Sequence, residues 1–493
     1  MSDSNKSSRD ILKSTSIIGG SKIFAIIISI VQVKIIAILL GPDGVGSVSL
    51  FTSTVSIVGA ITSFGINFSA VRNVAIAVAS NNNDQVSRII IIVKRWVIFS
   101  GVLGFALMAL FSDNISKWTF GDESKAFEIS FLAITLLFAS VSGGQSAILR
   151  GHRRIKDLGK INIYGALLGF FISIPIYYFY KEDGIVPVLV LMNLSTLITS
   201  WYFANRINLK TVNVSIKETW RVGLDFVKLG TFNALTGFFM AGSFYLVRIM
   251  ISDTIGIKEV GFFAVASALS IKYLDIILQT LGTDYFPRLS AVQSENLKLN
   301  VLVNEQTMIT LLIGTPLVLF MLTFPDLLIT ILYSSAFSES VFLLMWMTIG
   351  IYIKLVLWPI GFVFLAKANS KIFIFTQSIW HLVFIGFSYF GLSIYGIEAI
   401  GMAFSVAYLI TYLINLSILK TMNKFHYETK LLRIIIIMLV LVVSSFVLGM
   451  TISSNFKYVL TILALCIGLL ISIYQLNEIV SFKKLFKKFI RKG

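Results

Sequence analysis

The sequence predicts an all-helical membrane protein that crosses the bilayer many times. Of its 493 residues, 56% are hydrophobic and only 13% are charged, whereas soluble domains carry about 25% charged residues. The mean hydropathy is +0.88. Apolar runs recur along the chain, and each is long enough for the roughly 20 residues that a helix needs to cross the hydrocarbon core. The runs are continuous rather than alternating, which favours helices over a membrane β-barrel.

Hydropathy predicts about fourteen transmembrane helices, in chain order. They cover residues 16–40, 47–71, 89–111, 129–149, 161–180, 185–204, 226–252, 260–283, 305–325, 341–364, 372–390, 397–419, 433–451 and 457–474. The first helix follows a short polar segment and has full length, so we expect it to stay in the protein rather than to act as a cleaved signal peptide.

The distribution of positive charge predicts the orientation of these helices. With the N-terminus in the cytoplasm, 31 of the 41 Lys and Arg residues fall in cytoplasmic segments and only 5 in outer loops, as the positive-inside rule requires. Both termini are then cytoplasmic. The net charge of +17 reflects this topology, so no nucleic-acid partner is expected.

The tail 475–493 is basic and amphipathic. Its apolar residues recur at helical spacing and its lysines fill the other face. This pattern is typical of a helix that lies on anionic membrane lipid. A basic tail that only fixes the topology is the simpler interpretation.

Two weak matches suggest that the chain contains an internal repeat. Val45-Gly46 after the first helix resembles Val260-Gly261 after the seventh, at an offset of 215 residues. The basic loop at 149–153 also matches the loop at 365–369 in sequence, at an offset of 216 residues. Six helices per half would put both halves in the membrane in the same direction, with a pseudo-twofold axis along the membrane normal. We therefore predict four parts, namely a six-helix bundle at 1–215, a second at 216–425, two additional helices at 426–474 and the tail at 475–493.

Several kinds of chemistry are not indicated by the sequence. It has no phosphate-binding loop of the ATPase type, so ATP hydrolysis by that route is not expected. The single Cys466 excludes a disulfide framework, and His152, His381 and His426 are too far apart to form a zinc site by local spacing. The outer loops are too short for an external catalytic domain. We expect no enzyme activity and no cofactor.

Ionisable residues within the spans are the candidate substrate contacts, because a charge in the membrane usually lines a substrate or ion path. They are Lys34, Arg248, Lys272, Asp275 and Lys354. Arg72, at the inner end of the second span, is a candidate for the cytoplasmic entrance.

Each candidate also has a structural interpretation. Lys34 could extend to the membrane surface, and Lys272 with Asp275, three residues apart on one helix face, could form a neutral pair. Lys354 has no local counter-ion and needs water or a distant partner. His381 could couple transport to protons, although a hydrogen-bonded core histidine is the simpler assignment. Because cations outnumber carboxylates inside the spans, the sequence favours an anionic substrate such as a phosphate, a pyrophosphate or an acidic sugar.

Five short segments resemble one family of transporters. They are GSKI from Gly20 and LGPDGVG ending at Gly46, SFGI with VRN around Arg72, and PRL at 287–289. With the hydropathy pattern of the second half, they are similar to Wzx-type flippases, which are bacterial polysaccharide-biosynthesis transporters of the MATE-like MOP superfamily. The resemblance covers essentially the whole chain.

The resemblance implies a V-shaped core of two six-helix bundles plus two C-terminal helices. It also implies that the protein moves an undecaprenyl-pyrophosphate-linked oligosaccharide, such as an O-antigen repeat unit of lipopolysaccharide biosynthesis, to the outer leaflet by alternating access. The partners would be this glycan lipid, membrane lipids, H⁺ or Na⁺ as coupling ion, and the polymerase or chain-length machinery. Two alternatives stay open, a MATE-like drug/cation antiporter and a membrane polymerase.

Overall fold

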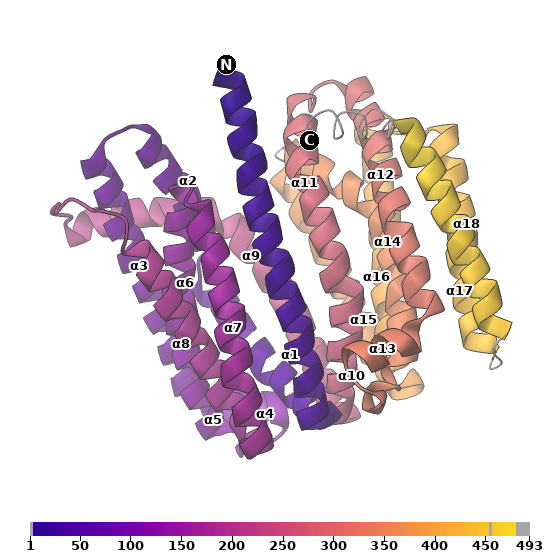
Figure 1. Cartoon of the computed structure of the whole chain (residues 1–493), viewed down its shortest axis with the longest axis horizontal. Coiled ribbons are helices and arrows are strands. Elements are labelled where there is room, and N and C mark those ends of the chain that lie inside the picture. The colour runs from indigo at the N-terminus through magenta and orange to yellow at the C-terminus, as the bar shows by residue number, and fades with distance from the viewer. Residues whose placement is uncertain (1–2, 368, 453–455, 480–493) are drawn as a thin grey trace. The chain divides into compact units, whose positions relative to one another are not determined.

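The computed structural model describes residues 3–367, 369–452 and 456–479, and within these ranges every regular element is a helix (Figure 1). The chain divides into two compact units, residues 1–261 and 262–493. In the described residues, twelve helical segments are long and apolar enough to cross a membrane. Of these segments, 155–204 contains two of the predicted spans, and 24–62 covers most of the first span and most of the second. The expected all-α polytopic fold is confirmed.

In its described residues, the unit formed by residues 1–261 contains nine α-helices, a short 3-10 helix (Lys181–Gly184) and the start of a tenth α-helix. The α-helices are α1 (Asp3–Thr62), α2 (Ile66–Ala79), α3 (Asn83–Leu110), α4 (Ser112–Phe120), α5 (Ala126–Leu132), α6 (Ile134–Gly151), α7 (Ile155–Tyr180), α8 (Ile185–Ala204), α9 (Ile216–Thr254) and α10 (Ile257–Ser267).

Helix α1 holds the first predicted span and most of the second, and it bends sharply between them. Gly41 has φ 66° and ψ −172°, a conformation that only glycine adopts without strain. Pro42 follows at the start of the second helical stretch, where its missing N–H costs nothing. A second break, with positive φ at Phe64 and Gly65, separates α1 from α2. The turn between the two spans is therefore encoded by its own residues.

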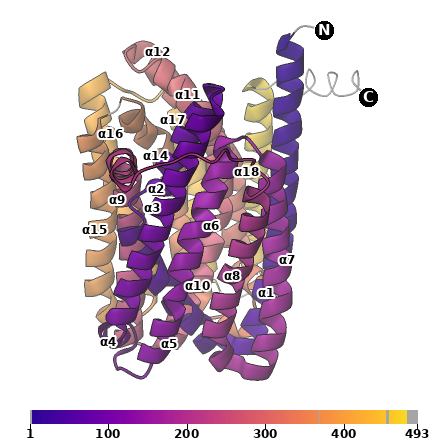
Figure 2. The same cartoon turned by 90° about the vertical axis from the view of Figure 1, so that its left-hand side faces the viewer.

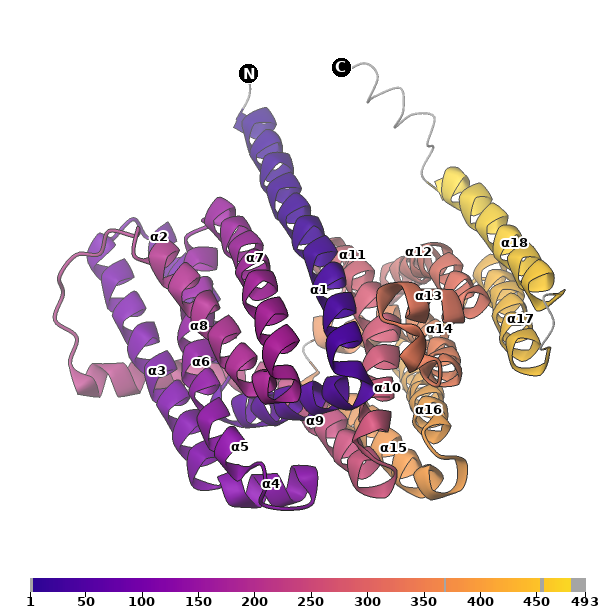
Figure 3. The same ribbon diagram turned by 60° about the horizontal axis from the view of Figure 1, so that its bottom comes forward.

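Helix α9 changes direction within its 39 residues. Its first turns run across the long axes of α3 and α6 (Figure 3), and Figure 2 shows them end-on beside vertical helices. Ser215 caps the start of the helix, because its hydroxyl accepts a hydrogen bond of 3.0 Å from the N–H of Glu218. The later part of α9 runs alongside the second half of α1.

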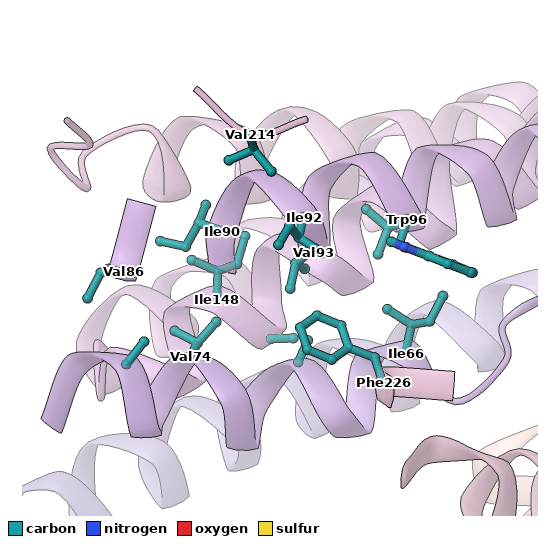
Figure 4. Close-up of a cluster of buried hydrophobic side chains, with 14 residues drawn as sticks. Ile66, Val74, Val86, Ile90, Ile92, Val93, Trp96, Ile148, Val214 and Phe226 are labelled. Carbon is teal, nitrogen blue, oxygen red and sulfur yellow. The ribbon is translucent and has the colours of Figure 1, made fainter. Parts of the chain in front are cut away.

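A buried apolar cluster holds the first turns of α9 against α2, α3 and α6 (Figure 4). Phe226 of α9 lies among Ile66, Val74 and Val93 in this cluster. The indole N–H of Trp96 donates a hydrogen bond of 2.8 Å to the carbonyl oxygen of Thr219. Burial of large apolar side chains contributes roughly 1.5–3 kcal/mol for each one, so packing stabilises the orientation of this segment.

The unit formed by residues 262–493 contains the rest of α10 and a second set of helices. A π-helical turn (Ala268–Lys272) joins α10 to α11 (Tyr273–Ala291). The others are α12 (Asn296–Thr323), α13 (Pro325–Leu332), α14 (Ser340–Ala366), α15 (Ser370–Tyr395), α16 (Glu398–Asn423), α17 (Thr429–Thr451) and α18 (Phe456–Ile479). Tyr285 of α11 is buried against α14, where its hydroxyl donates to the carbonyl oxygen of Pro359 at 3.0 Å.

Four features differ from the predicted elements. The span predicted at 47–71 is not one helix, because the backbone breaks at Phe64 and Gly65 and continues as α2. The short helices α4 and α13 connect longer ones and are not among the predicted spans. Helix α18 ends at Ile479, five residues beyond the predicted end of the last span. The part of the predicted basic tail from residue 480 onward lies outside the described residues. The predicted four-part division stays a prediction, because compact units need not coincide with sequence repeats.

Candidate functional site

Arg248 of α9 lies beside the second half of α1. Its Nε donates a hydrogen bond of 2.7 Å to the hydroxyl of Ser49, and its Nη1 donates to the carbonyl oxygen of Phe244 at 3.0 Å. The guanidinium is also 5.7 Å from the centroid of the Phe244 ring. The side chain is only half-buried. A membrane-span arginine is thus held in one orientation by a hydroxyl, a carbonyl and an aromatic ring.

The second half of α1 and the later part of α9 form an antiparallel pair. Residue numbers rise along α1 as those of their partners fall along α9. The α1–α9 pairs are Ser49 with Arg248, Thr54 with Tyr245 and Ile57 with Gly242. The same order continues beyond the helix ends, where Gly46 of α1 meets Ile257 of α10 and Gly65, between α1 and α2, meets Gly230 of α9. The hydroxyl of Tyr245 also forms a hydrogen bond of 2.7 Å with Thr119 of α4.

Backbones touch at both ends of this pair, and at the Gly46 end they do so in the two helical turns that the sequence repeat relates. A Cβ atom at Gly46 would lie 2.1 Å from the carbonyl oxygen of Ile257, and one at Gly261 would lie 2.1 Å from that of Pro42. An offset of 215 residues converts Gly46 into Gly261 and Pro42 into Ile257. The two contacts are therefore reciprocal, as in an interface with twofold symmetry.

Lys34 lies in the first half of α1 and is half-buried. Two residues earlier, the buried Gln32 donates hydrogen bonds to the carbonyl oxygen of Gly169 at 3.2 Å and to the hydroxyl of Ser173 at 2.9 Å, both on α7. Residues two apart lie about 200° apart around a helix. Lys34 therefore points away from α7. Arg72 lies on α2 and is exposed.

Lys354 of α14 and Asp275 of α11 form an ion pair, with Nζ and Oδ1 2.5 Å apart. Their side chains are 15% and 27% exposed. The ring of Tyr408 of α16 also lies near the ammonium group, with its centroid 6.0 Å from Nζ. The structure therefore supplies the distant partner that the sequence analysis required for Lys354, in a cluster joining three helices.

Lys272 does not pair with Asp275 in the described part of the chain, although the spacing allowed it. Lys272 ends the π-helical turn and is exposed. A π turn holds an extra residue and changes the angle between side chains before and after it. A largely buried ammonium group also needs a counter-ion more than an exposed one, because water solvates the exposed group. The carboxylate of Asp275 accordingly contacts Lys354.

His381 of α15 is buried, and its ring meets that of Trp380 edge-on with centroids 4.9 Å apart. Trp380 in turn lies 5.2 Å from the ring of Tyr408. This aromatic packing extends from the histidine to the Lys354 cluster. Within the described residues, no three His, Cys, Asp or Glu side chains are grouped so that they could hold a metal ion.

The candidate residues thus fall into two groups. In residues 1–261, Arg248 lies in the α1–α9 pair, Lys34 lies on the other half of α1, and Arg72 is on α2. In residues 262–493, Asp275 and Lys354 are in contact and Lys272 is exposed nearby in the chain. The sequence analysis did not single out Ser49, Gln32 or Tyr408. Gln32 carried a usable signal, because it is a polar side chain in the middle of an apolar run.

Comparison with known proteins places the chain in sequence and structural context. The profile described as "Polysaccharide biosynthesis protein" matches residues 35–342. The chain is 21% identical over 398 residues to the Lipid III flippase of Escherichia coli, covering 78% of this chain and 91% of that protein.

Two solved structures share the fold. The lipid II flippase MurJ, in an inward closed conformation, has a TM-score of 0.66 at 14% identity and covers 94% of this chain and 98% of its own. An inward-facing MATE-family multidrug resistance transporter of the MOP superfamily has a TM-score of 0.65 at 16% identity, covering 81% and 96%. These likenesses establish a MATE- and MurJ-like fold.

Proposed function

This chain belongs to the family of polysaccharide biosynthesis proteins, and on that premise we propose that it is a flippase for an undecaprenyl-pyrophosphate-linked oligosaccharide, such as an O-antigen repeat unit. The glycan lipid moves from the inner to the outer leaflet of the cytoplasmic membrane, with both termini of the chain in the cytoplasm. The similarity to a Lipid III flippase over 91% of that protein supports a lipid-linked glycan as the cargo.

The observation that carries the proposal is the placement of Lys272. This ammonium group lies in a membrane-spanning segment, 257–291, and is exposed there. The nearest carboxylate along the chain, Asp275, contacts Lys354 instead. Two lysines and one aspartate leave a net positive charge in this region. A pyrophosphate carries negative charges that such a cation attracts through charge-assisted hydrogen bonds.

Lys34, Arg248 and Arg72 complete the proposed cationic path. Arg248 offers a planar guanidinium that suits two-point contact with phosphate oxygens. Lys34 faces away from α7, so its side chain is not part of the packing between α1 and α7. Arg72 is exposed on α2 and serves the cytoplasmic entrance. The polyprenyl tail of the cargo stays in the bilayer.

The reciprocal contact of the two turns supports a gating step. Gly46 and Gly261 allow backbone approaches that any larger residue would prevent. In the proposed cycle, this contact closes the outer side while cargo enters from the cytoplasm, and its separation opens the path outward. The two predicted bundles rock about the central site, driven by a H⁺ or Na⁺ gradient or by downstream consumption of the cargo by the polymerase machinery.

The alternative function is a MATE-like drug/cation antiporter, because this chain shares its fold with a MATE-family transporter. A cationic drug requires an available carboxylate, whereas the carboxylate of Asp275 is already bound to Lys354. Raised drug tolerance on overexpression would support the antiporter. No catalytic step is part of the flippase mechanism.

Removal of single charges tests the proposal in cells. We expect Lys34→Ala, Arg248→Ala and Lys272→Ala each to reduce surface polysaccharide, with protein levels in the membrane measured in parallel. Lys258→Ala, in the first turn of α10, is the matched control for loss of one positive charge. Full export by all three mutants, at normal protein levels, would contradict the cationic path.

A further inference from the structure

The first turns of α9 carry a solvent-exposed apolar stripe that the flippase mechanism does not use. Ile216, Trp220 and Leu224 are 74%, 43% and 50% exposed. They are four residues apart and share one side of the helix. The side of α9 that packs on α3 is a different one. It carries Thr219, Gly223 and Phe226, which are buried.

The charged residues of this segment are sorted around the helix. At about 100° per residue, the exposed cations Lys217, Arg221 and Lys228 lie next to the apolar stripe. The acidic residues Glu218 and Asp225 lie beyond the cations, farther from the apolar stripe. The order of apolar, cationic and then acidic side chains is the one expected of a helix at a membrane surface, with apolar groups among acyl chains and cations among anionic headgroups.

The apolar stripe is continuous with the membrane-facing side of α3. Ile98, Phe99, Val102 and Phe105 of α3 are exposed. The ring of Trp220 lies 5.2 Å from that of Phe99 and 4.9 Å from that of Trp96. Tryptophan is enriched where the hydrocarbon core meets the headgroups. Trp220 therefore marks the depth at which α9 meets the leaflet.

A cavity of about 160 Å³ opens in the corner between α3 and α9. Its lining residues are Arg95, Trp96, Phe99, Ile216, Thr219 and Trp220. The guanidinium of Arg95 is held there, because its Nη1 donates hydrogen bonds of 2.8 Å to the carbonyl oxygen of Val214 and to the hydroxyl of Thr219. The corner thus offers an oriented cation beside three aromatic rings.

We propose that this corner binds an anionic phospholipid of the leaflet at the basic end of the helices. The lipid phosphate contacts Arg95, and its acyl chains extend along Phe99, Trp220 and Leu224. Neighbouring anionic headgroups contact Lys217 and Arg221. The bound lipid fixes the first turns of α9 to the membrane, while the later part of the same helix carries Arg248. This inference does not depend on the nature of the transported cargo.

The position of the stripe is tested on the full-length protein in nanodiscs. A Cys466→Ser background allows a single cysteine to be labelled with bimane at Leu224→Cys or, as the control on the acidic side, at Asp225→Cys. We expect brominated phosphatidylglycerol to quench the label at 224 at least twice as strongly as the label at 225. Equal quenching at the two positions would overturn the membrane-facing assignment.

Lipid selectivity is tested by native mass spectrometry of the delipidated protein with phosphatidylglycerol or phosphatidylcholine. We expect Arg95→Gln to weaken phosphatidylglycerol binding roughly fivefold, the effect of one cation near a membrane surface, and Arg95→Lys to retain most of it. Arg206→Gln is the matched control, since Arg206 stacks on Tyr202, 4.4 Å from its ring centroid. If Arg95→Lys loses as much binding as Arg95→Gln, or if the wild type binds both lipids equally, the phosphate site is refuted.

Discussion

The two units of the molecule hold a membrane-span cation in different ways. In residues 1–261, Arg248 contacts a hydroxyl on α1 and a carbonyl of its own helix. In residues 262–493, Lys354 contacts the carboxylate of Asp275 from another helix. A hydroxyl or a carbonyl orients a cation without cancelling its charge, whereas a carboxylate does both. The carboxylate partner indicates that Lys354 mainly stabilises its bundle. The oriented guanidinium of Arg248 and the exposed ammonium group of Lys272 are the groups that we propose receive an anion.

The largest effect is expected from breaking the ion pair. Asp275→Asn would leave the ammonium group of Lys354, which is 15% exposed, without its counter-ion. Removal of one partner of a buried pair costs about 3–5 kcal/mol. We expect a clear loss of thermal stability, measured by the fraction of protein that stays monodisperse after heating in detergent.

The double mutant Asp275→Asn with Lys354→Met is the control for this prediction. Because neither charge is then buried, most of the lost stability should return. If the single mutant is as stable as the wild type, Lys354 is compensated by other groups and the contrast between the two units is wrong.

The next effect concerns the reciprocal turns. In Gly46→Ala and in Gly261→Ala, the new methyl group would overlap a backbone carbonyl oxygen 2.1 Å away. Overpacking of this kind costs about 1–3 kcal/mol, so the contact should open and glycan export should fall by roughly tenfold.

Gly165→Ala in α7 provides the matched substitution, because a Cβ atom there meets nothing within 4 Å. We expect the same readout, surface polysaccharide at equal protein level, to be unchanged in this control. Normal export by both turn mutants would contradict a gating role for the contact.

A smaller effect is expected at the hydroxyl that orients Arg248. Ser49→Ala removes the acceptor of the 2.7 Å hydrogen bond from Nε, and a hydrogen bond to a charged group contributes about 1.5–3 kcal/mol. Because Arg248 is only half-buried, water replaces part of this contact, and we expect a loss of stability near the lower limit. Ser56→Ala, whose hydroxyl bonds only within its own helix at Thr52, should be nearly neutral in the same unfolding assay.

The smallest effect is expected at the surface pair between α3 and α9. Arg88 and Glu218 are 3.2 Å apart, with side chains 47% and 26% exposed. Exposed pairs contribute about 0.2–1 kcal/mol. Arg88→Gln should therefore shift the unfolding midpoint only slightly, and less in high salt. A shift of the midpoint as large as that of Asp275→Asn would mean that an exposed ion pair stabilises the fold as much as a buried one, and would contradict this ranking.

Most of the fold could be predicted from the sequence because a membrane span leaves a long apolar run. The span predicted at 185–204 coincides with α8. Short helices such as α4 and α13 could not be predicted, since nine or eight residues give no hydropathy signal of transmembrane length. The bend at Gly41 was readable from Gly-Pro, whereas the crossing of α9 over α3 depends on the buried Trp96 and Phe226.

Less of the candidate site than of the fold could be predicted from the sequence. Hydropathy identified every ionisable candidate, but it could not pair Asp275 with Lys354, which lie 79 residues apart. The spacing of three residues instead favoured a pair between Lys272 and Asp275. The π-helical turn that redirects Lys272 leaves no clear sequence signal, so the sequence could not correct this prediction. The sequence could not single out Ser49 either, because its hydrogen bond with Arg248 depends on the position of α9 beside α1.

The most direct test of the central claim is the rate at which the purified protein moves a pyrophosphate-linked glycan lipid across proteoliposomes. The account predicts that Lys272→Gln slows this movement at least tenfold, that Lys272→Arg retains most of it, and that a cationic drug is not transported by either variant or by the wild type. Equal rates for wild type and Lys272→Gln, or transport of the cationic drug in place of the glycan lipid, would contradict it.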